Sequence, residues 1–391
     1  MIARARWVAF KIVLAIVIGL TATGFWPSAA AAAPSPPSVR ADAAILMDLR
    51  TGQVLYSMRP DAREYPASTT KILTGLIALE LGRLDDLVTV KSDVLKADGT
   101  SIYLEPGEQE TLRDLLYAMF LNSANDAAVA VADYVAGNTT DFARLMNAVA
   151  AKAGATKSNF VNPNGLVDKN HYTTARDLAL IARYAMHNPT FAAMVSTRTH
   201  DMPWPEKDDE RHLINQNHFL SRYEYATGVK PGYTTQAKDT LVASASKDGI
   251  DLVAVIMRAN GGGIWTDAER LMDYGFAVAP KTVKAVSPGD GLAVAAAKEL
   301  GLQVASSSTP AVNPTPSTPA ANPQPDGGSV WRGVIKAGLP LAALFGLSVW
   351  AVRRPRARRR GRFVMSRRPA VPRRVTHGGR TYVHRSIYRP R

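Results

Sequence analysis

The chain has 391 residues and a formal net charge of +14, but this charge is concentrated at one end. Residues 353–391 contain fifteen arginines and no acidic residue, so the remainder has a formal net charge of −1. This distribution does not indicate a nucleic-acid-binding surface on the main body. The chain contains no cysteine, which excludes disulfide bonds, a thiol nucleophile and cysteine-ligated metal centres.

Residues 1–33 are typical of a secretory signal peptide. Positive residues near the start are followed by an apolar run at 12–20 and by small residues at 28–33. An uncleaved N-terminal anchor is the alternative, because the apolar run can be extended to Trp26. Both interpretations predict that the following chain is exported.

Residues 34–280 predict one domain with strands at both ends and helices between them. Apolar-rich runs at 43–49 and 53–58 predict a β-hairpin, and apolar residues at helical spacing over 72–79 predict a helix that begins near Ser68. Further helices are predicted at 112–120, 124–135 and 175–186, and two strands at 241–246 and 251–257. This order predicts an α+β fold in which a mostly antiparallel sheet is flanked by helices.

The C-terminal hundred residues differ in composition from this domain. After a short remnant segment at 281–304, residues 305–329 are dominated by Pro, Ser, Thr, Ala and Asn, which predicts an extended linker. Residues 333–352 contain a single charge and predict a transmembrane helix, for which a buried core helix is the alternative.

The arginines at 353–391 follow the predicted span directly. Positive residues beside a span stay in the cytoplasm, so we expect a single-pass protein of the cell membrane with its catalytic domain outside and its tail inside. Anionic lipid is favoured over nucleic acid as the partner of this tail, which has no recognisable nucleic-acid-binding fold.

The first candidate motif is Ser68-Thr69-Thr70-Lys71 at the start of the predicted helix. Residues three apart lie on one face of a helix, so the hydroxyl of Ser68 and the amine of Lys71 would be neighbours. A serine becomes a nucleophile when a base removes its proton, and a neutral lysine can be that base. The pattern is short, and a solvated helix face is the alternative explanation.

Two further motifs can complete a site. Ser123-Ala124-Asn125 offers a hydroxyl that can transfer a proton and an amide that can orient a substrate carbonyl or Lys71, although Ser123 would also suit a helix cap. Lys230-Pro231-Gly232, predicted at the start of an extended stretch, offers a cation for a substrate carboxylate and a glycine that lets the backbone approach the substrate. An exposed turn has the same composition.

In this order the three motifs resemble the Ser-x-x-Lys, Ser-x-Asn and Lys-Thr-Gly set of penicillin-binding proteins and serine β-lactamases. The resemblance covers about 43–276 and looks closest to the low-molecular-mass D-alanyl-D-alanine carboxypeptidases. Supporting stretches are found at 66–71, 162–166, 171–177, 228–233 and 271–276.

The resemblance implies a β-lactamase/transpeptidase-like fold and removal of the terminal D-alanine from peptidoglycan stem pentapeptides, inhibited by β-lactams. Ser68 would form the acyl-enzyme, with Lys71 as its base and Ser123 as a proton carrier. The backbone N–H groups of Ser68 and Tyr233 would form the oxyanion hole. The substrate-binding residues would be Asn125, Lys230, Gly232 and Tyr233. The resemblance implies no metal and no cofactor.

Two departures from the family pattern affect these expectations. Pro231 replaces the family's threonine and removes both a hydroxyl and a backbone N–H, which is tolerable on an edge strand. Thr234 and Thr235 are the nearest hydroxyls that could replace it. The chain after Phe276 is also too short for the β-rich C-terminal domain that many relatives carry.

Two other functions share part of this pattern. A class A β-lactamase needs a Glu for deacylation, but the first Glu between Ser123 and Lys230 is Glu206, and 162–166 has none. A non-catalytic or altered-specificity penicillin-binding module would not need the complete polar set. His171, His187, His200, His212 and His218 have no zinc-ligand spacing, and only His171 is expected near the cleft.

Overall fold

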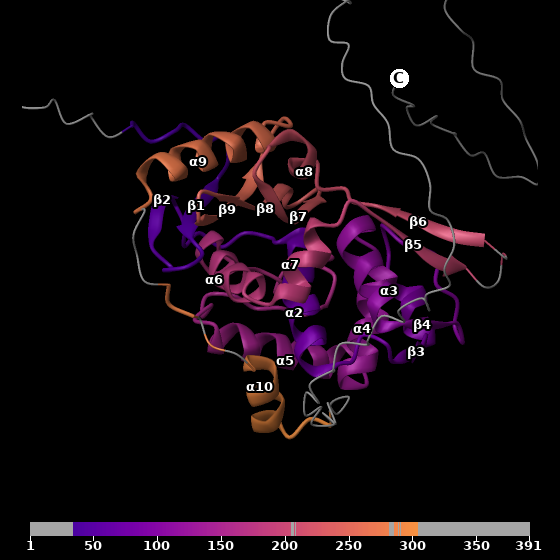
Figure 1. Cartoon of the computed structure of the whole chain (residues 1–391). Coiled ribbons are helices and arrows are strands. Elements are labelled where there is room, and N and C mark those ends of the chain that lie inside the picture. The colour runs from indigo at the N-terminus through magenta and orange to yellow at the C-terminus, as the bar shows by residue number, and fades with distance from the viewer. Residues whose placement is uncertain are drawn as a thin grey trace, which may run out of the picture. The chain divides into compact units, whose positions relative to one another are not determined.

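Figure 1 shows the computed structural model of the protein, which describes residues 34–303 except 205–206, 208, 281–284, 288 and 290. The predicted signal peptide, linker, membrane span and tail, at 1–33, 305–329, 333–352 and 353–391, lie outside these residues. Among the helices of the described part, none is both long and apolar enough to cross a membrane.

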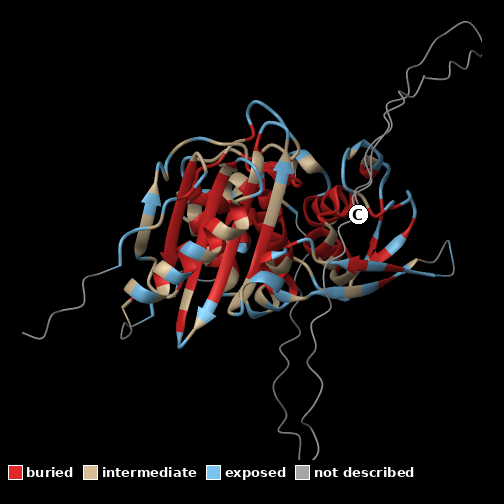
Figure 2. Cartoon of the chain, turned by 90° about the horizontal axis from the view of Figure 1, so that it is seen from above, coloured by how far each residue is buried: buried red, intermediate tan, exposed pale blue. Residues whose placement is uncertain are grey.

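An antiparallel sheet of five strands lies at the centre of the domain, in the order β2-β1-β9-β8-β7. Its strands are β1 (Ala43–Asp48), β2 (Val54–Met58), β7 (Ala226–Thr234), β8 (Lys238–Lys247) and β9 (Ile250–Ala259). Figure 2 shows that its central strands are buried. The N-terminal hairpin therefore pairs with a hairpin from late in the chain, and β7 is left at one edge.

Two details of the sheet differ from the sequence prediction. Lys230 lies in the middle of β7, because the strand already begins at Ala226. Gly228, near the start of the strand, is of a residue type that is depleted in strands. The connection from β8 to β9 is a two-residue turn of Asp248 and Gly249, both with positive φ. Positive φ at both positions is the conformation that a tight hairpin requires.

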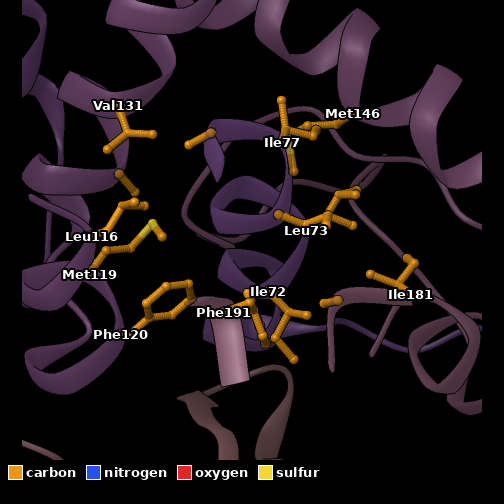
Figure 3. Close-up of a cluster of buried hydrophobic side chains, with 14 of the residues drawn as sticks. Ile72, Leu73, Ile77, Leu116, Met119, Phe120, Val131, Met146, Ile181 and Phe191 are labelled. Atoms are coloured by element: carbon orange, nitrogen blue, oxygen red, sulfur yellow. The ribbon is translucent and has the colours of Figure 1, made fainter. Parts of the chain in front are cut away.

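Helix α2 (Lys71–Leu81) lies at the centre of the helical layer on one face of the sheet (Figure 3). Nine of its eleven residues are buried, as expected for a helix that is apolar on all sides. It is surrounded by α3 (Leu112–Tyr117), the π-helical turn η3 (Ala118–Asn122), α4 (Asn125–Ala136), α5 (Thr139–Lys152), α6 (Ala175–Met186) and α7 (Pro189–Ser196). The start of α2, which carries the first motif, is therefore held by packing from several directions.

The opposite face of the sheet is covered by α9 (Ile264–Val278) and the short helix α8 (Phe219–Arg222). The smaller elements are the helical turn η2 (Ser92–Lys96), the pair β3 (Leu87–Thr89) and β4 (Gln109–Thr111), and the hairpin of β5 (Thr199–Trp204) and β6 (Asp209–Ile214). Buried Arg211 joins this hairpin to Glu110 on β4 and, at 2.7 Å, to Glu108.

The segment 281–304, expected as a short remnant, contains helix α10 (Leu292–Leu300). This helix packs against α5 and α2 through Ala293, Ala296 and Ala297. Its first backbone N–H groups are bonded by the hydroxyl of Tyr184 and the carboxylate of Glu80. It therefore closes the helical core on the side away from the sheet.

Candidate active site

The first motif begins in a tight turn, η1 (Ala67–Thr70), which leads directly into α2. Ser68 lies in this turn, and Lys71 is the first residue of the α-helix. The Lys71 amine lies 3.1 Å from the Ser68 hydroxyl, so the predicted pair is formed.

Lys71 is fully buried and makes two further contacts. Its Nζ donates to Asn125 Oδ1 at 2.7 Å and to the backbone oxygen of Asn164 at 2.7 Å. The Asn125 amide is oriented because its Nδ2 donates to the oxygen of Asp98 at 2.6 Å. The sequence prediction that Asn125 orients Lys71 agrees with this geometry, whereas the carbonyl of Asn164 was not predicted.

The two lysines of the site have perturbed pKa values. Burial lowers the pKa of Lys71 well below its usual range, and the charge of Lys230 lowers it further, against an opposing effect of Asp126. Burial lowers the pKa of Lys230 to about 7. Desolvation disfavours the charged form of a lysine, so this site favours a neutral amine on Lys71.

Ser123 lies between η3 and α4 in a left-handed conformation, with φ +63°. The N-cap of α4 is Ala124, which forms no side-chain capping hydrogen bond, and Ser123 lies one residue before it. The helix-cap explanation for Ser123 therefore does not hold. A left-handed serine that caps nothing is a strained feature of the kind found at functional sites.

Strand β7 brings the third motif against the first. A Cβ on Gly232 would lie 2.7 Å from the backbone nitrogen of Ser68 and 2.6 Å from Thr240 Oγ1, so only glycine fits here. Lys230 is buried in the same strand, whereas Tyr233 is 64 % exposed. The structure thus brings Ser68 and Gly232 together and leaves Tyr233 at the rim.

Pro231 lies in the edge strand β7, where the sheet can accommodate a residue without a backbone N–H. Of the two candidate replacement hydroxyls, Thr234 Oγ1 accepts the N–H of Ala237 at 2.9 Å in the turn after β7. Thr235 is exposed beyond the strand. A different hydroxyl lies nearer the cleft: the Oγ1 of buried Thr240 on β8 is 3.1 Å from the backbone oxygens of both Pro66 and Gly232, which share its single proton.

The loop at 162–166 packs against the turn that carries Ser68. A Cβ on Gly165 would lie 1.8 Å from the backbone oxygen of Ala67, which itself has a strained φ of +50°. The hydroxyl of Thr74 fixes the loop by donating to the oxygen of Pro163 at 2.6 Å. The loop and the turn that carries Ser68 are therefore packed backbone against backbone.

His171 is buried against the first motif, where it contacts Thr70. Its Nδ1 accepts the N–H of Val161 at 3.2 Å, so Nε2 carries the proton and donates to Thr70 Oγ1 at 3.0 Å. Burial is the main cause that lowers its pKa to about 4. His171 is thus a neutral support for the turn.

Asp126 is a residue that sequence reasoning missed, although it follows Asn125 directly. Its carboxylate accepts the hydroxyl of Ser101 and the backbone N–H groups of Ile102 and Leu104, at 2.5 to 3.1 Å for Oδ2. The backbone oxygen of Thr100 in turn accepts the N–H of Asn125 at 2.7 Å. Asp126 therefore fixes the loop at 98–104 beside the cleft.

The family profile of the D-alanyl-D-alanine carboxypeptidases, peptidase S11, matches residues 30–261. The chain belongs to this family. The D-alanyl-D-alanine carboxypeptidase DacF of Bacillus subtilis is 34% identical over 260 residues, which are 64% of this chain and 66% of that protein. DacB2 of Mycobacterium tuberculosis is 38% identical over 245 residues, 61% of this chain and 82% of that protein.

Solved structures agree with the family assignment. A D-alanyl-D-alanine carboxypeptidase from Mycobacterium tuberculosis superposes with a TM-score of 0.61 at 34% identity, over 66% of this chain and 98% of that one. The Streptomyces K15 DD-transpeptidase superposes with a TM-score of 0.59 at 32% identity, over 63% and 100%. These matches confirm the expected penicillin-binding, α+β fold for the carboxypeptidase domain.

Proposed function

We propose that the protein is a serine D-alanyl-D-alanine carboxypeptidase that removes the terminal D-alanine from peptidoglycan stem peptides. The observation that carries this proposal is the 3.1 Å approach of the Ser68 hydroxyl to the buried amine of Lys71. Family membership supports the substrate class, and the arrangement of donors around Lys71 supports the roles of the residues.

Counting protons around Lys71 explains how it can serve as the base. A neutral amine has two N–H groups and one lone pair. The oxygens of Asn125 and Asn164 can only accept, so they take both N–H groups. The lone pair remains for the third neighbour, and the hydroxyl of Ser68 donates to it. The site thus holds a neutral Lys71 in the orientation needed to remove the Ser68 proton.

The reaction follows in two steps. Ser68 Oγ attacks the carbonyl carbon between the terminal D-alanines while its proton passes to Lys71. The N–H groups of Ser68 and Tyr233 stabilise the oxyanion, a contribution of about 3 kcal/mol per donor. The C–N bond breaks as the proton reaches the leaving amine through Ser123, and water then attacks the ester and regenerates Ser68.

The surroundings of Ser68 favour a carboxypeptidase over a β-lactamase. Among the described residues, no carboxylate is hydrogen-bonded to Ser68 or Lys71. The loop at 162–166 contributes a backbone oxygen at this position instead of a glutamate. Rapid deacylation of a penicillin needs a base for water, so the acyl-enzyme formed with a β-lactam should persist.

The test is D-alanine release from a peptide ending in D-Ala-D-Ala, with labelling by a fluorescent penicillin in parallel. We expect the wild type to show both activities and Ser68→Ala to show neither. Labelling without release would refute carboxypeptidase activity and point to an altered-specificity module. Absence of both in the wild type would indicate a non-catalytic binding module.

We further propose that this domain acts on the outer side of the cell membrane, attached by a span at 333–352. The sequence pattern at 1–33 and the arginines at 353–391 support this location. Added protease should release the domain from intact spheroplasts. Protection of the domain until the cells are lysed would contradict the proposal.

A further inference from the structure

A basic cavity of about 470 Å³ lies beside the nucleophile turn and has no role in the steps above. Its lining contains three cations and one acid. The lining residues are Arg63, Glu64, Tyr65, Lys169, Asn170, Tyr172 and Arg258. We call it the basic pocket.

Two of the cations are free to bind an anion. In the part of the chain that the structure describes, neither Arg63 nor Lys169 forms an ion pair with a carboxylate. The guanidinium carbon of Arg63 lies 4.5 Å from the centre of the Tyr172 ring, a cation–π contact that holds the side chain beside the pocket. Arg258, by contrast, already contacts Asp42 at 3.2 Å.

The walls of the basic pocket are fixed by backbone hydrogen bonds. Glu64 and Thr173 exchange N–H···O bonds of 2.9 and 3.0 Å, which join the segment before Ser68 to the segment after Asn170. Asn159 Nδ2 donates to the oxygen of Asn170 at 2.6 Å. These bonds fix the backbone on two sides of the pocket.

The basic pocket is close to the reacting centre. Tyr65 precedes Ser68 by three residues, so their Cα atoms are at most about 10 Å apart. His171, between Asn170 and Tyr172, touches the turn through Thr70. A side chain on a bound peptide can span such a distance.

The direction of the bound peptide leads toward the same end of the sheet. If the terminal carboxylate of the substrate lies toward Lys230, a peptide paired antiparallel to edge strand β7 places its upstream residues beside Tyr233 and Thr234. Tyr233 pairs with Asp239, and Asp239 pairs with Ala259, the neighbour of Arg258. The upstream residues thus run toward the sheet end that carries Arg258 of the pocket.

We infer that the basic pocket binds a free carboxylate on the side chain of the residue that precedes the D-Ala-D-Ala unit. This inference rests on the proposed function, because it assigns a specificity site to the same substrate. Arg63 and Lys169 supply the positive charge that recognises the carboxylate.

The test compares two peptides, acetyl-Xaa-D-Ala-D-Ala, in which Xaa is L-2-aminoadipate or its side-chain amide. For the full-length wild type we expect kcat/KM to be about tenfold higher for the acid, with the difference in KM. In the double variant Arg63→Gln/Lys169→Gln, the ratio of kcat/KM for the acid to kcat/KM for the amide should fall to about one.

The control is Arg83→Gln/Arg144→Gln, which removes the same charge from two exposed surface ion pairs. This control variant should retain the preference for the acid. That result would show that the preference depends on contacts in the basic pocket and not on the total positive charge of the protein. Penicillin labelling of every variant checks that Ser68 still reacts. Equal kcat/KM for both peptides in the wild type would overturn the inference alone, whereas hydrolysis of neither peptide would overturn the proposed function as well.

Discussion

Lys230 is a buried lysine for which the described residues provide no carboxylate partner; its Nζ donates to the oxygen of Pro231 at 3.3 Å. Its positive charge favours the loss of a proton from Lys71. In the proposed mechanism, Lys230 would therefore act on the base as well as on the substrate. Because burial lowers the pKa of Lys230 to about 7, this effect is strongest below neutral pH.

Substitution Lys230→Gln should move the acidic limb of the acylation profile to higher pH. Removing the Lys230 charge raises the pKa of Lys71, so less of the neutral base is present at a given pH. The measurement is the second-order rate of penicillin acylation as a function of pH. The pH at which the acidic limb falls reports the pKa of Lys71, even if the maximal rate is lower in the variant. An acidic limb at the wild-type pH would show that Lys230 does not lower the pKa of Lys71.

Asp133, in the last turn of α4, is buried, and neither carboxylate oxygen has a hydrogen-bond partner among the described residues. Burial raises its pKa to about 6. A carboxylate near a helix C-terminus is also disfavoured by the helix dipole. The charged form of Asp133 is thus a cost to the folded state.

Substitution Asp133→Asn should stabilise the protein above pH 6 by about 1 to 3 kcal/mol. A raised pKa means that the folded state binds this proton more tightly, so the contribution to stability is complete below pH 4 and lost as pH rises through 6. Urea unfolding should therefore show no gain near pH 4. Asp141→Asn, which removes an exposed carboxylate bonded to Arg144, should give no gain at either pH.

At the scale of elements, the site depends on how closely the loop at 162–166 approaches η1. Gly165 has φ +89° and contacts the backbone of Ala67, the residue before the nucleophile. Gly137, which ends α4, has φ +81°, but a Cβ added there would meet nothing within 4 Å. The two glycines therefore share a backbone conformation and differ in their surroundings.

Substitution Gly165→Ala should lower the penicillin acylation rate at least tenfold, because the methyl group must displace the turn that carries Ser68. Gly137→Ala should cost about 1 to 2 kcal/mol of stability through its positive φ and leave acylation unchanged. Stopped-flow labelling and thermal unfolding of both variants provide the comparison. Equal acylation by the two variants would show that the contact with Ala67 does not position the nucleophile.

At the scale of the whole domain, α10 completes the core after the region that the family profile covers. Its buried side chains are small, and Lys152 on α5 forms an ion pair with Glu299 on α10 at 2.5 Å. Because the helix lies against α2 and α5, it supports the helix that carries Lys71 without reaching the cleft.

Substitution Ala296→Glu should destabilise the full-length protein by about 3 kcal/mol, because an unpaired charge would be buried against the core. Ala295→Glu, at the neighbouring exposed position, should change stability by less than about 0.5 kcal/mol. Denaturant unfolding gives both values. If the two variants unfold alike, α10 is not docked in solution.

The sequence by itself determined the features that depend on local periodicity and residue type. Alternating and helical patterns predicted the hairpin at the N-terminus, the helix at Lys71, the break at Ser123 and the late strands, because backbone geometry imposes those periods on any buried face. The three motifs also contained most of the site. The missing N–H of Pro231 is tolerable on an edge strand, and β7 is such a strand.

Only the tertiary structure decided which groups meet. The backbone oxygen of Asn164, 93 residues from Lys71, could not be recognised as a partner of Lys71 from the sequence, because every residue has a backbone carbonyl. The tautomer of His171 is likewise set by Val161 and Thr70, which lie on other segments. Helix α10 was missed because its short run of alanines indicates burial only once α2 and α5 are in place. Contacts between distant segments depend on packing, and packing is not encoded at any single position.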